Sequence, residues 1–276
     1  MRPLADLPAE ACRDLAGVVF DVDDTLTDDG LLGEAAYGAL WALARAGLDL
    51  VAVTGRPLGF CDVFARQWPV AAAVGENGGG WVFRRGGRLV EGYFDDEATR
   101  AGQRLRLEAL AARARAALPG LRLASDQRLR RVDLAFDLAE EARVDDEARA
   151  RLLALIESAG ARALVSSIHA HAFFGAHDKA SGAARAVAAA LGRDLDAERP
   201  RWLFVGDSGN DAAAFASFPL SAAVANVRAH LAALPVPPAF VAAEERGAGF
   251  AAIAAAVLQR RRAPASSDVS APGAVR

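Results

Sequence analysis

Five aspartates stand within nine residues directly after an apolar run near the start of the chain, in GVVFDVDDTLTDDG at 17–30. Carboxylates this close repel one another, and each loses hydration when it is partly enclosed. A divalent cation bound by oxygen ligands would compensate them. Asp28 and Asp29 fit a solvated turn, whereas Asp21 and Asp23 come directly after the apolar residues. We therefore expect the chemistry to lie at Asp21 and Asp23.

Three further polar groups stand where apolar runs end or helices begin. Thr54 follows VAV, Asp207 and Asp211 follow WLFV, and Lys179, the sole lysine of the chain, begins a helical pattern. In doubly wound sheets, sites form in the crevice beyond the carboxyl ends of the strands. We expect these groups to converge there with Asp21.

Together these groups could move a phosphoryl group through an aspartyl-phosphate. A carboxylate that attacks phosphorus must have its repulsion from the anionic phosphate suppressed. A bound Mg²⁺, a lysine and a hydroxyl can do this, and a second carboxylate can protonate the leaving oxygen and then activate water.

The elements that must position these groups alternate between strands and helices. Apolar runs at 15–20, 48–53, 71–74 and 202–205 predict buried strands, and helical patterns at 34–47 and 179–192 each end in glycine. Strands that are apolar on both faces indicate a parallel sheet covered by helices. The fold class predicted is α/β, with a Rossmann-like doubly wound parallel sheet formed by 1–81 and 176–261.

The middle of the chain reads differently. A hairpin pattern about Gly86-Gly87 is followed by two helical stretches and two stretches of alternating polarity, typical of half-buried antiparallel strands. We expect residues 82–175 to form an inserted α+β domain. The small, polar and proline-containing segment 262–276 predicts a disordered tail.

At this point the sequence resembles the haloacid dehalogenase (HAD) superfamily of phosphohydrolases. DVDDT at 21–25 matches its first motif, VTGR at 53–56 its second and GDSGND at 206–211 its fourth, while Lys179 stands at the place of the third-motif lysine. The resemblance implies that Asp21 is the nucleophile and Asp23 the general acid and base.

The same resemblance implies the binding roles. Thr54, Gly55 and Lys179 would bind the transferred phosphoryl group. Mg²⁺ would be held by Asp21, by Asp207 and by the backbone carbonyl of Asp23. Asn210 and Asp211 would support the fourth-motif loop.

The spacing of the motifs resembles the type IIB branch, which carries an α+β cap of type C2B and includes Cof-like and sugar-phosphate phosphatases. Thirty-three residues separate Asp21 from Thr54, whereas 125 separate Thr54 from Lys179, which leaves room for the cap only in the second position. GENGG at 75–79 is similar to a segment of that branch near the substrate mouth, which implies substrate contacts for Glu76 and Asn77. Asp24 departs from the pattern, because relatives usually carry glycine there.

Three other side chains are candidates for substrate contact. Arg56 follows the second motif directly. His169 and His171 are two residues apart on a predicted strand and so face the same side. Substrate contact and plain strand packing both remain open for the two histidines, and without further clustered ligands we do not expect them to bind metal.

Composition excludes several classes of protein. A chain of 276 residues with 53% hydrophobic and 24% charged residues is globular, and a net charge of -3 argues against a nucleic-acid partner. No uninterrupted apolar run is long enough for a membrane helix and the N-terminus does not read as a signal peptide, so we expect a cytoplasmic protein with no membrane partner. Cys12 and Cys61 lack metal-site or CxxC spacing and fit ordinary core positions.

The function that these observations favour is a Mg²⁺-dependent phosphatase for a small phosphorylated metabolite, most plausibly a sugar phosphate. A sugar phosphomutase could use the same site. A receiver domain shares the aspartates, threonine and lysine but needs about half this length, and a binding module without activity would not need every catalytic position. The oligomeric state stays open.

Overall fold

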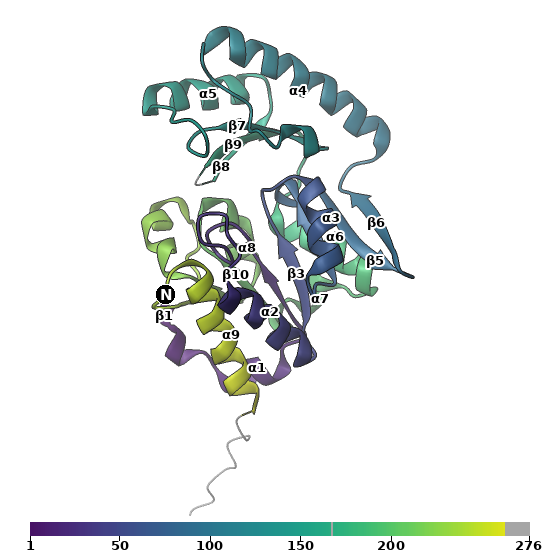
Figure 1. The fold of residues 1–276 in the computed structure, drawn as a ribbon, viewed down its shortest axis with the longest axis vertical. Coiled ribbons are helices and arrows are strands. Elements are labelled where there is room, and N and C mark those ends of the chain that lie inside the picture. Colours follow the sequence, from purple (N-terminus) through teal and green to yellow (C-terminus); the bar gives the residue numbers. More distant parts are fainter. Residues whose placement is uncertain (167, 263–276) are drawn as a thin grey trace, which may run out of the picture.

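The computed structural model describes residues 1–166 and 168–262, which form a large α/β body and a smaller unit above it (Figure 1). The tail expected at 262–276 lies, from residue 263 onward, outside the described residues. Within the described ranges, no helix is both long and apolar enough to cross a membrane.

A nine-stranded sheet runs through the large body, in the order β1-β12-β11-β10-β2-β3-β4-β5-β6. The strands from β1 to β4 in this order pair in parallel, and β5 and β6 are antiparallel additions at one edge. Their bounds are β1 Arg2–Pro3, β2 Gly17–Phe20, β3 Asp49–Val53, β4 Ala72–Gly75, β5 Gly80–Arg85, β6 Arg88–Tyr93, β10 Trp202–Gly206, β11 Leu220–Ala223 and β12 Phe240–Val241.

Helices cover both faces of this sheet, because its central strands are apolar on both sides. In β2, Val18 and Phe20 face one core while Val19 faces the other, and all three are fully buried. The first core is closed by α1, α2, α3 and α9 and the second by α6, α7 and α8. The bounds are α1 Ala9–Asp14, α2 Glu34–Arg45, α3 Leu58–Gln67, α6 Lys179–Leu191, α7 Leu195–Glu198, α8 Ala212–Ser217 and α9 Arg246–Arg262.

The predicted Rossmann-like α/β class is confirmed by this sheet, but the expected boundary at residue 82 is wrong. The hairpin of β5 and β6 does not join the inserted segment: Trp81 pairs with Val74 of β4 and extends the large sheet. The reason is the tight turn η2 (Glu76–Gly78), which returns the chain antiparallel to β4, where α3 and α6 can cover the new strand.

The smaller unit has its own three-stranded antiparallel sheet, in the order β7-β9-β8, with two helices over it. The elements are α4 Glu97–Ala117, β7 Asp133–Asp137, α5 Asp146–Ser158, β8 Arg162–Val165 and β9 His169–Phe173, and the short turn η3 (Gln127–Leu129) precedes β7. Residues of α4, α5 and the strands form a separate hydrophobic core. Because this core does not extend into the large body, the opposite face of the small sheet is free to form a site against the body.

Candidate active site

Three predicted site residues come together beyond the carboxyl ends of β2, β3 and β10. Phe20 at the end of β2 pairs with Val205 of β10 and with Ala52 of β3. Asp21 continues this pairing, since its amide donates to the Val205 carbonyl at 2.9 Å. The parallel register therefore brings the residues that follow each strand, Asp21, Thr54 and Asp207, to one edge of the sheet.

Lys179 reaches the same edge from the start of α6. Asp178 caps this helix by accepting from the amide of Ser181, while the Ser181 hydroxyl accepts from the Asp178 amide. This capping box fixes the first turn of the helix. The fully buried Lys179 side chain then donates from Nζ to Asp21 Oδ1 and to Asp211 Oδ1, each at 2.6 Å.

We call Asp21, Asp207, Asp211 and Lys179 the floor cluster. Ligand oxygens of the three aspartates lie within 4.8 Å of one another. The Asp211 carboxylate also accepts from the amides of Asp207 and Ser208, at 2.8 and 3.1 Å, which ties the loop after β10 to the cluster.

Charge in the floor cluster is not balanced, since one lysine faces three buried carboxylates. Burial raises the pKa of Asp21 to about 7, because desolvation and the repulsion from Asp211 outweigh the attraction of Lys179. Burial and the charges of Asp21 and Asp211 raise the pKa of Asp207 well above its usual value. Buried acids in this state favour a further cation.

Oxygen donors suited to a hard divalent cation surround these carboxylates. The Thr25 hydroxyl donates to Asp207 Oδ1 at 3.1 Å and contacts Asp21 Oδ2 at 3.4 Å, and Asn226 donates to Asp207 Oδ2 at 2.8 Å. Hydrogen bonds of this kind orient carboxylate ligands. The donor set is all oxygen and its excess charge is negative, so it fits Mg²⁺ and does not fit a thiophilic metal.

Asp23 lies beside the floor cluster and is held by Arg56. Arg56 Nε lies 2.9 and 3.1 Å from the two carboxylate oxygens of Asp23, and the Thr54 hydroxyl donates to Asp23 at 3.3 Å. Arg56 also donates from Nη1 to Glu140 of the smaller unit at 2.9 Å. One guanidinium thus links the expected acid–base residue to the unit above it.

The residues at 24 and 226 explain a departure from the motif. Asp24 has a φ of 57°, in the left-handed region where glycine is favoured and aspartate is among the side chains best tolerated. Its carbonyl accepts from Asn226 Nδ2 at 3.0 Å. Asp24 therefore keeps the backbone path that a glycine would give.

A second buried ionic group, which we call the hinge cluster, joins the smaller unit to the body and consists of Asp126, Arg130, Asp133 and His171. Arg130 pairs with Asp126 and Asp133 at 3.0 Å each, and donates to the Gly55 carbonyl at 2.9 Å. His171 Nδ1 lies 2.9 Å from Asp133 Oδ2.

The two predicted histidines lie on the same side of β9, with ring centroids 5.8 Å apart. His169 Nε2 lies 2.8 Å from Glu140 Oε2, and burial lowers the pKa of His169. Both rings face the small cavity of about 20 Å³ above Asp21, which is also lined by Asp23, Gly55, Arg56, Ser166, Ile168, Ser208 and Asn210. They are thus in reach of a ligand at the floor cluster.

Glu76 does not line this cavity, contrary to the expected substrate contact. Its fully buried carboxylate accepts hydrogen bonds from four backbone amides, those of Leu58, Arg131, Val132 and Asp133. Burial and the nearby Asp133 raise the pKa of Glu76 to about 7. The carboxylate fastens the body to the start of the smaller unit and has no lone pair left for substrate.

Asn77 also lies outside the cavity lining, but it touches two residues that line it. Its side-chain oxygen accepts from Asn210 at 3.4 Å, and its backbone amide donates to the Thr54 carbonyl at 3.0 Å. The side chain packs against Gly55. Asn77 therefore supports the loops at 54–56 and 208–211, directly behind the cavity lining, and its contact with substrate stays a prediction.

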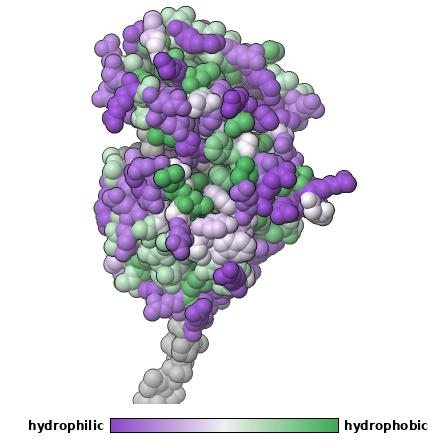
Figure 2. Space-filling view, viewed as in Figure 1, coloured by the Kyte–Doolittle hydropathy of each residue, from purple (hydrophilic) through white to green (hydrophobic). Residues whose placement is uncertain are grey.

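A wider groove of about 470 Å³ begins at Asp23 and Arg56 and runs between the 27–32 loop and α3. Phe60, Phe64 and Trp68 line it, and the rings of Phe64 and Trp68 stack at 3.9 Å. Asp29 and Glu140 supply acidic groups at its rim. Figure 2, drawn in the same view as Figure 1, shows hydrophobic residues exposed in the middle of the molecule, below the smaller unit.

Sequence reasoning missed Thr25, Asn226, Arg130, Asp133 and Glu140. Thr25 was within reach, because it stands inside the first motif. The others carry no local signal: Asn226 lies in the 3₁₀ turn η6 (Ala225–Ala233), and the cluster around Arg130 is recognisable only once β7 and β9 are paired.

Comparisons with known proteins identify the fold. No family model matches the chain, and no curated protein matches it in sequence. Solved structures do match. One is a protein from Thermoplasma acidophilum, with 22% identity and a TM-score of 0.67 over 88% of this chain and 98% of that chain.

Two other matching structures carry functional descriptions. The sucrose-phosphatase of Synechocystis, in complex with sucrose and phosphate, has 16% identity and a TM-score of 0.62 over 89% of this chain and 98% of its own. A sugar phosphatase of HAD subclass IIB has 14% identity and a TM-score of 0.58 over 88% and 97%. The chain has the fold of HAD phosphatases. At these identities the likeness establishes the fold alone.

Proposed function

We propose that this protein is a Mg²⁺-dependent phosphatase that hydrolyses a small phosphorylated metabolite through an aspartyl-phosphate. The observation that carries the proposal is the floor cluster, in which Lys179 bridges Asp21 and Asp211 beside Asp207. A cluster of acids with one lysine at the carboxyl end of a parallel sheet matches what in-line attack by a carboxylate on phosphorus requires.

In the first step, an oxygen of Asp21 attacks phosphorus and the bond from phosphorus to the leaving oxygen breaks, while Asp23 gives its proton to that oxygen. In the second step, Asp23 takes a proton from water, the water attacks the phosphorus of the aspartyl-phosphate, and Asp21 is released with inorganic phosphate. Lys179, the Thr54 hydroxyl and the backbone at Gly55 hold the other phosphoryl oxygens through both steps.

Asp21 and Asp207 would hold the metal, together with the backbone carbonyl of Asp23. When bound, Mg²⁺ supplies positive charge that offsets the repulsion between the carboxylates and the phosphate.

Arg56 has a role that precedes the chemistry. Asp23 cannot donate a proton while both of its oxygens pair with Arg56, so substrate phosphate must draw the guanidinium away. Because Arg56 also bonds Glu140, this exchange would pass the state of the site to the smaller unit. We propose that residues 94–175 act as a cap of type C2B that excludes water from the site.

A sugar phosphate is the substrate class that the groove beside Asp23 favours. The groove offers the aromatic faces of Phe60 and Trp68 for the apolar side of a sugar ring and the carboxylates of Asp29 and Glu140 for its hydroxyls. The sucrose-phosphatase and the subclass IIB sugar phosphatase among the matching structures support this choice.

Hydrolysis of p-nitrophenyl phosphate tests the reaction. We expect activity with Mg²⁺, loss of activity in EDTA, and loss in Asp21→Asn with unchanged circular dichroism, while the exposed control Asp6→Asn stays fully active. Full activity of Asp21→Asn, or activity undiminished by EDTA, would refute the mechanism. A screen of phosphorylated sugars, polyols and glycerates then defines the substrate.

A phosphomutase could use the same groups if the phosphoryl group returned to a sugar hydroxyl in place of water. Product analysis separates the two reactions, because a mutase yields an isomer of its substrate and little free phosphate. We expect stoichiometric release of phosphate.

A further inference from the structure

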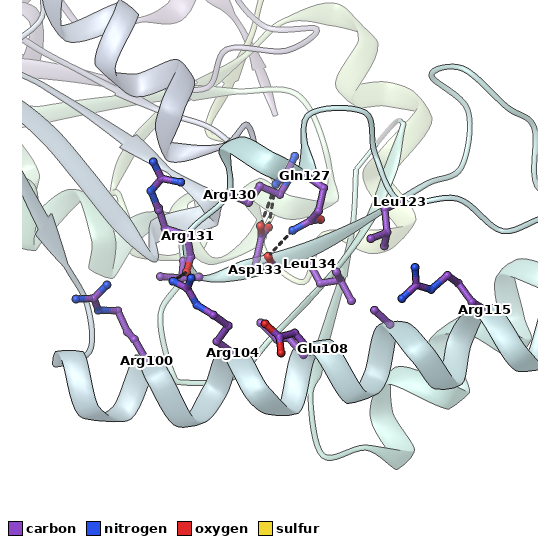
Figure 3. A pocket seen from close by; sticks show the side chains of 13 residues that line it. Arg100, Arg104, Glu108, Arg115, Leu123, Gln127, Arg130, Arg131, Asp133 and Leu134 are labelled. Atoms are coloured by element: carbon purple, nitrogen blue, oxygen red, sulfur yellow. Dashed lines mark hydrogen bonds and ion pairs between the residues drawn. The ribbon is translucent and has the colours of Figure 1, made fainter.

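A second cavity, of about 300 Å³, lies in the smaller unit, away from the floor cluster (Figure 3). One wall is the length of α4, and the opposite wall is the chain from Leu123 to Leu134. Its size is at the lower end of the range for small-molecule sites. None of the roles proposed above uses this cavity.

The inner surface of this cavity is apolar. Leu107 and Ala111 of α4 face Leu134 of β7, and all three side chains are buried, while Leu123 is half-buried at the edge. Contact between this apolar surface and water is unfavourable, and the apolar body of a ligand would cover the surface.

Four arginines surround this apolar inner surface. In Figure 3, Arg100, Arg104 and Arg131 gather at one end of the cavity and Arg115 reaches in from the other end. None of the four guanidinium groups has a carboxylate within ion-pair distance among the described residues. Two acids line the cavity: Asp133 is already paired with Arg130 and His171 of the hinge cluster, which leaves Glu108. Four unpaired cations beside one acid that is not already compensated make a site for an anion.

At the end of the cavity where Arg100, Arg104 and Arg131 lie, N–H groups of the arginines are still available to an acceptor. Arg100 stacks on Tyr93 at 3.7 Å, and its buried Nε has no hydrogen-bond partner in the part of the chain that is described. Within residues 1–166 and 168–262, Arg104 donates only to the Arg131 carbonyl, at 3.5 Å. A buried donor without a partner is unfavourable, so an acceptor from outside the chain would stabilise this end of the cavity.

We propose that this cavity binds an organic anion with an apolar body, its carboxylate, sulfonate or phosphate group at Arg100, Arg104 and Arg131 and its hydrocarbon against Leu107, Ala111 and Leu134. Inorganic phosphate would leave the apolar inner surface of the cavity exposed to water, and a neutral hydrocarbon would leave the guanidinium groups without an anionic partner. The wall formed by Arg130 separates this ligand from Gly55 and the floor cluster, so the proposal does not depend on the phosphatase reaction.

Fluorescence titration with 8-anilinonaphthalene-1-sulfonate tests the proposal, with the uncharged N-phenyl-1-naphthylamine as the matched neutral probe. We expect saturable binding of the sulfonate at one site per chain, roughly tenfold or more tighter than the neutral probe, because charge-assisted contacts of the sulfonate add to the same apolar burial. Equal affinity for the two probes, or no saturable binding, would overturn the proposal.

Charge reversal locates the site. In Arg100→Glu/Arg104→Glu we expect sulfonate affinity to fall about tenfold or more, with affinity for the neutral probe unchanged. Arg113→Glu/Arg149→Glu makes the same change in net charge at exposed positions of α4 and α5 outside the cavity and should bind as the wild type does.

Equal loss in the two double variants, or none in the first, would contradict the proposal. Should the first double variant fail to fold, Arg104→Gln gives the same test, because it removes one positive charge at an exposed position of the end that holds the anionic group: it should weaken binding of the sulfonate and leave the neutral probe unaffected.

Discussion

The floor cluster and the hinge cluster are both buried, and both combine aspartates with a cation, yet their electrostatics are opposite. In the hinge cluster, burial by itself would raise the pKa of Asp133, but Arg130 and His171 outweigh burial and lower this pKa to about 2. In the floor cluster, burial and mutual repulsion outweigh Lys179 and raise the pKa of Asp21 to about 7.

This difference separates a structural cluster from a reactive one. The carboxylates of the hinge cluster are compensated by the chain itself, with Arg130 fully buried between Asp126 and Asp133. Those of the floor cluster are short of positive charge, although their geometry is equally well defined. Groups with perturbed pKa values in a cleft mark functional sites, and the missing charge indicates which ligand the floor cluster takes.

Removing Lys179 should have the largest effect. Lys179→Met leaves three buried carboxylates without their cation, and we expect hydrolysis to fall by about 10³-fold or more because a charged donor to the reacting phosphate is lost. Steady-state kinetics on p-nitrophenyl phosphate measures this. Lys179→Arg, which keeps the charge in a bulkier group, should recover little; activity of Lys179→Met within tenfold of the wild type would contradict the assignment.

Removing Arg130 should act on stability. Arg130→Met leaves Asp126 and Asp133 buried without their partner, and we expect a loss of about 3–5 kcal/mol in the free energy of unfolding, as for other broken buried ion pairs. Urea denaturation measures it. The neighbouring Arg128 is exposed, and Arg128→Met should change stability by less than about 0.5 kcal/mol. Equal stability of the two variants would remove the contrast between the clusters.

His177 extends the comparison to a buried titratable group with no partner. Neither ring nitrogen has a hydrogen-bond partner among the described residues, the ring packs on Phe173 at 4.5 Å, and burial lowers its pKa to about 4. The unfolded chain, with an ordinary histidine pKa near 6.5, therefore binds the proton first as the pH falls, so the folded state loses stability between pH 6.5 and 4.

The loss expected from His177 is about 3 kcal/mol across this range. His177→Phe should remove it, so the free-energy difference between the variant and the wild type should grow as the pH falls. Urea denaturation at pH 7, 5.5 and 4.5 measures this difference. A difference that does not change with pH would show that His177 takes up its proton as readily in the folded state.

The smallest effect concerns the groove. Phe60→Ala removes one aromatic face, and we expect KM for the preferred sugar phosphate to rise roughly fivefold, about 1 kcal/mol, with kcat nearly unchanged. The control is Val63→Ala on the exposed side of the same helix. A change in kcat alone would indicate that Phe60 positions catalytic groups and does not contact the leaving group.

The two clusters also differ in how far the sequence predicts them. All members of the floor cluster were predicted, because each directly follows a buried strand or begins a helix, and parallel pairing carries such positions to one edge. Asp133 and Arg130 were not, because their partners Gly55 and His171 come from other parts of the chain and nothing local marks them. Glu76 was assigned to substrate because its motif lies near the site, but packing directs its carboxylate to four amides.

The central claim is that the floor cluster lacks positive charge and takes it from a divalent cation. Calorimetric titration of the metal-free protein with Mg²⁺ tests it most directly. We expect one site in the wild type, retention of that site in Asp126→Asn of the hinge cluster, and loss of at least tenfold in affinity in Asp207→Asn. Unchanged binding in Asp207→Asn, or no binding to the wild type, would contradict the account.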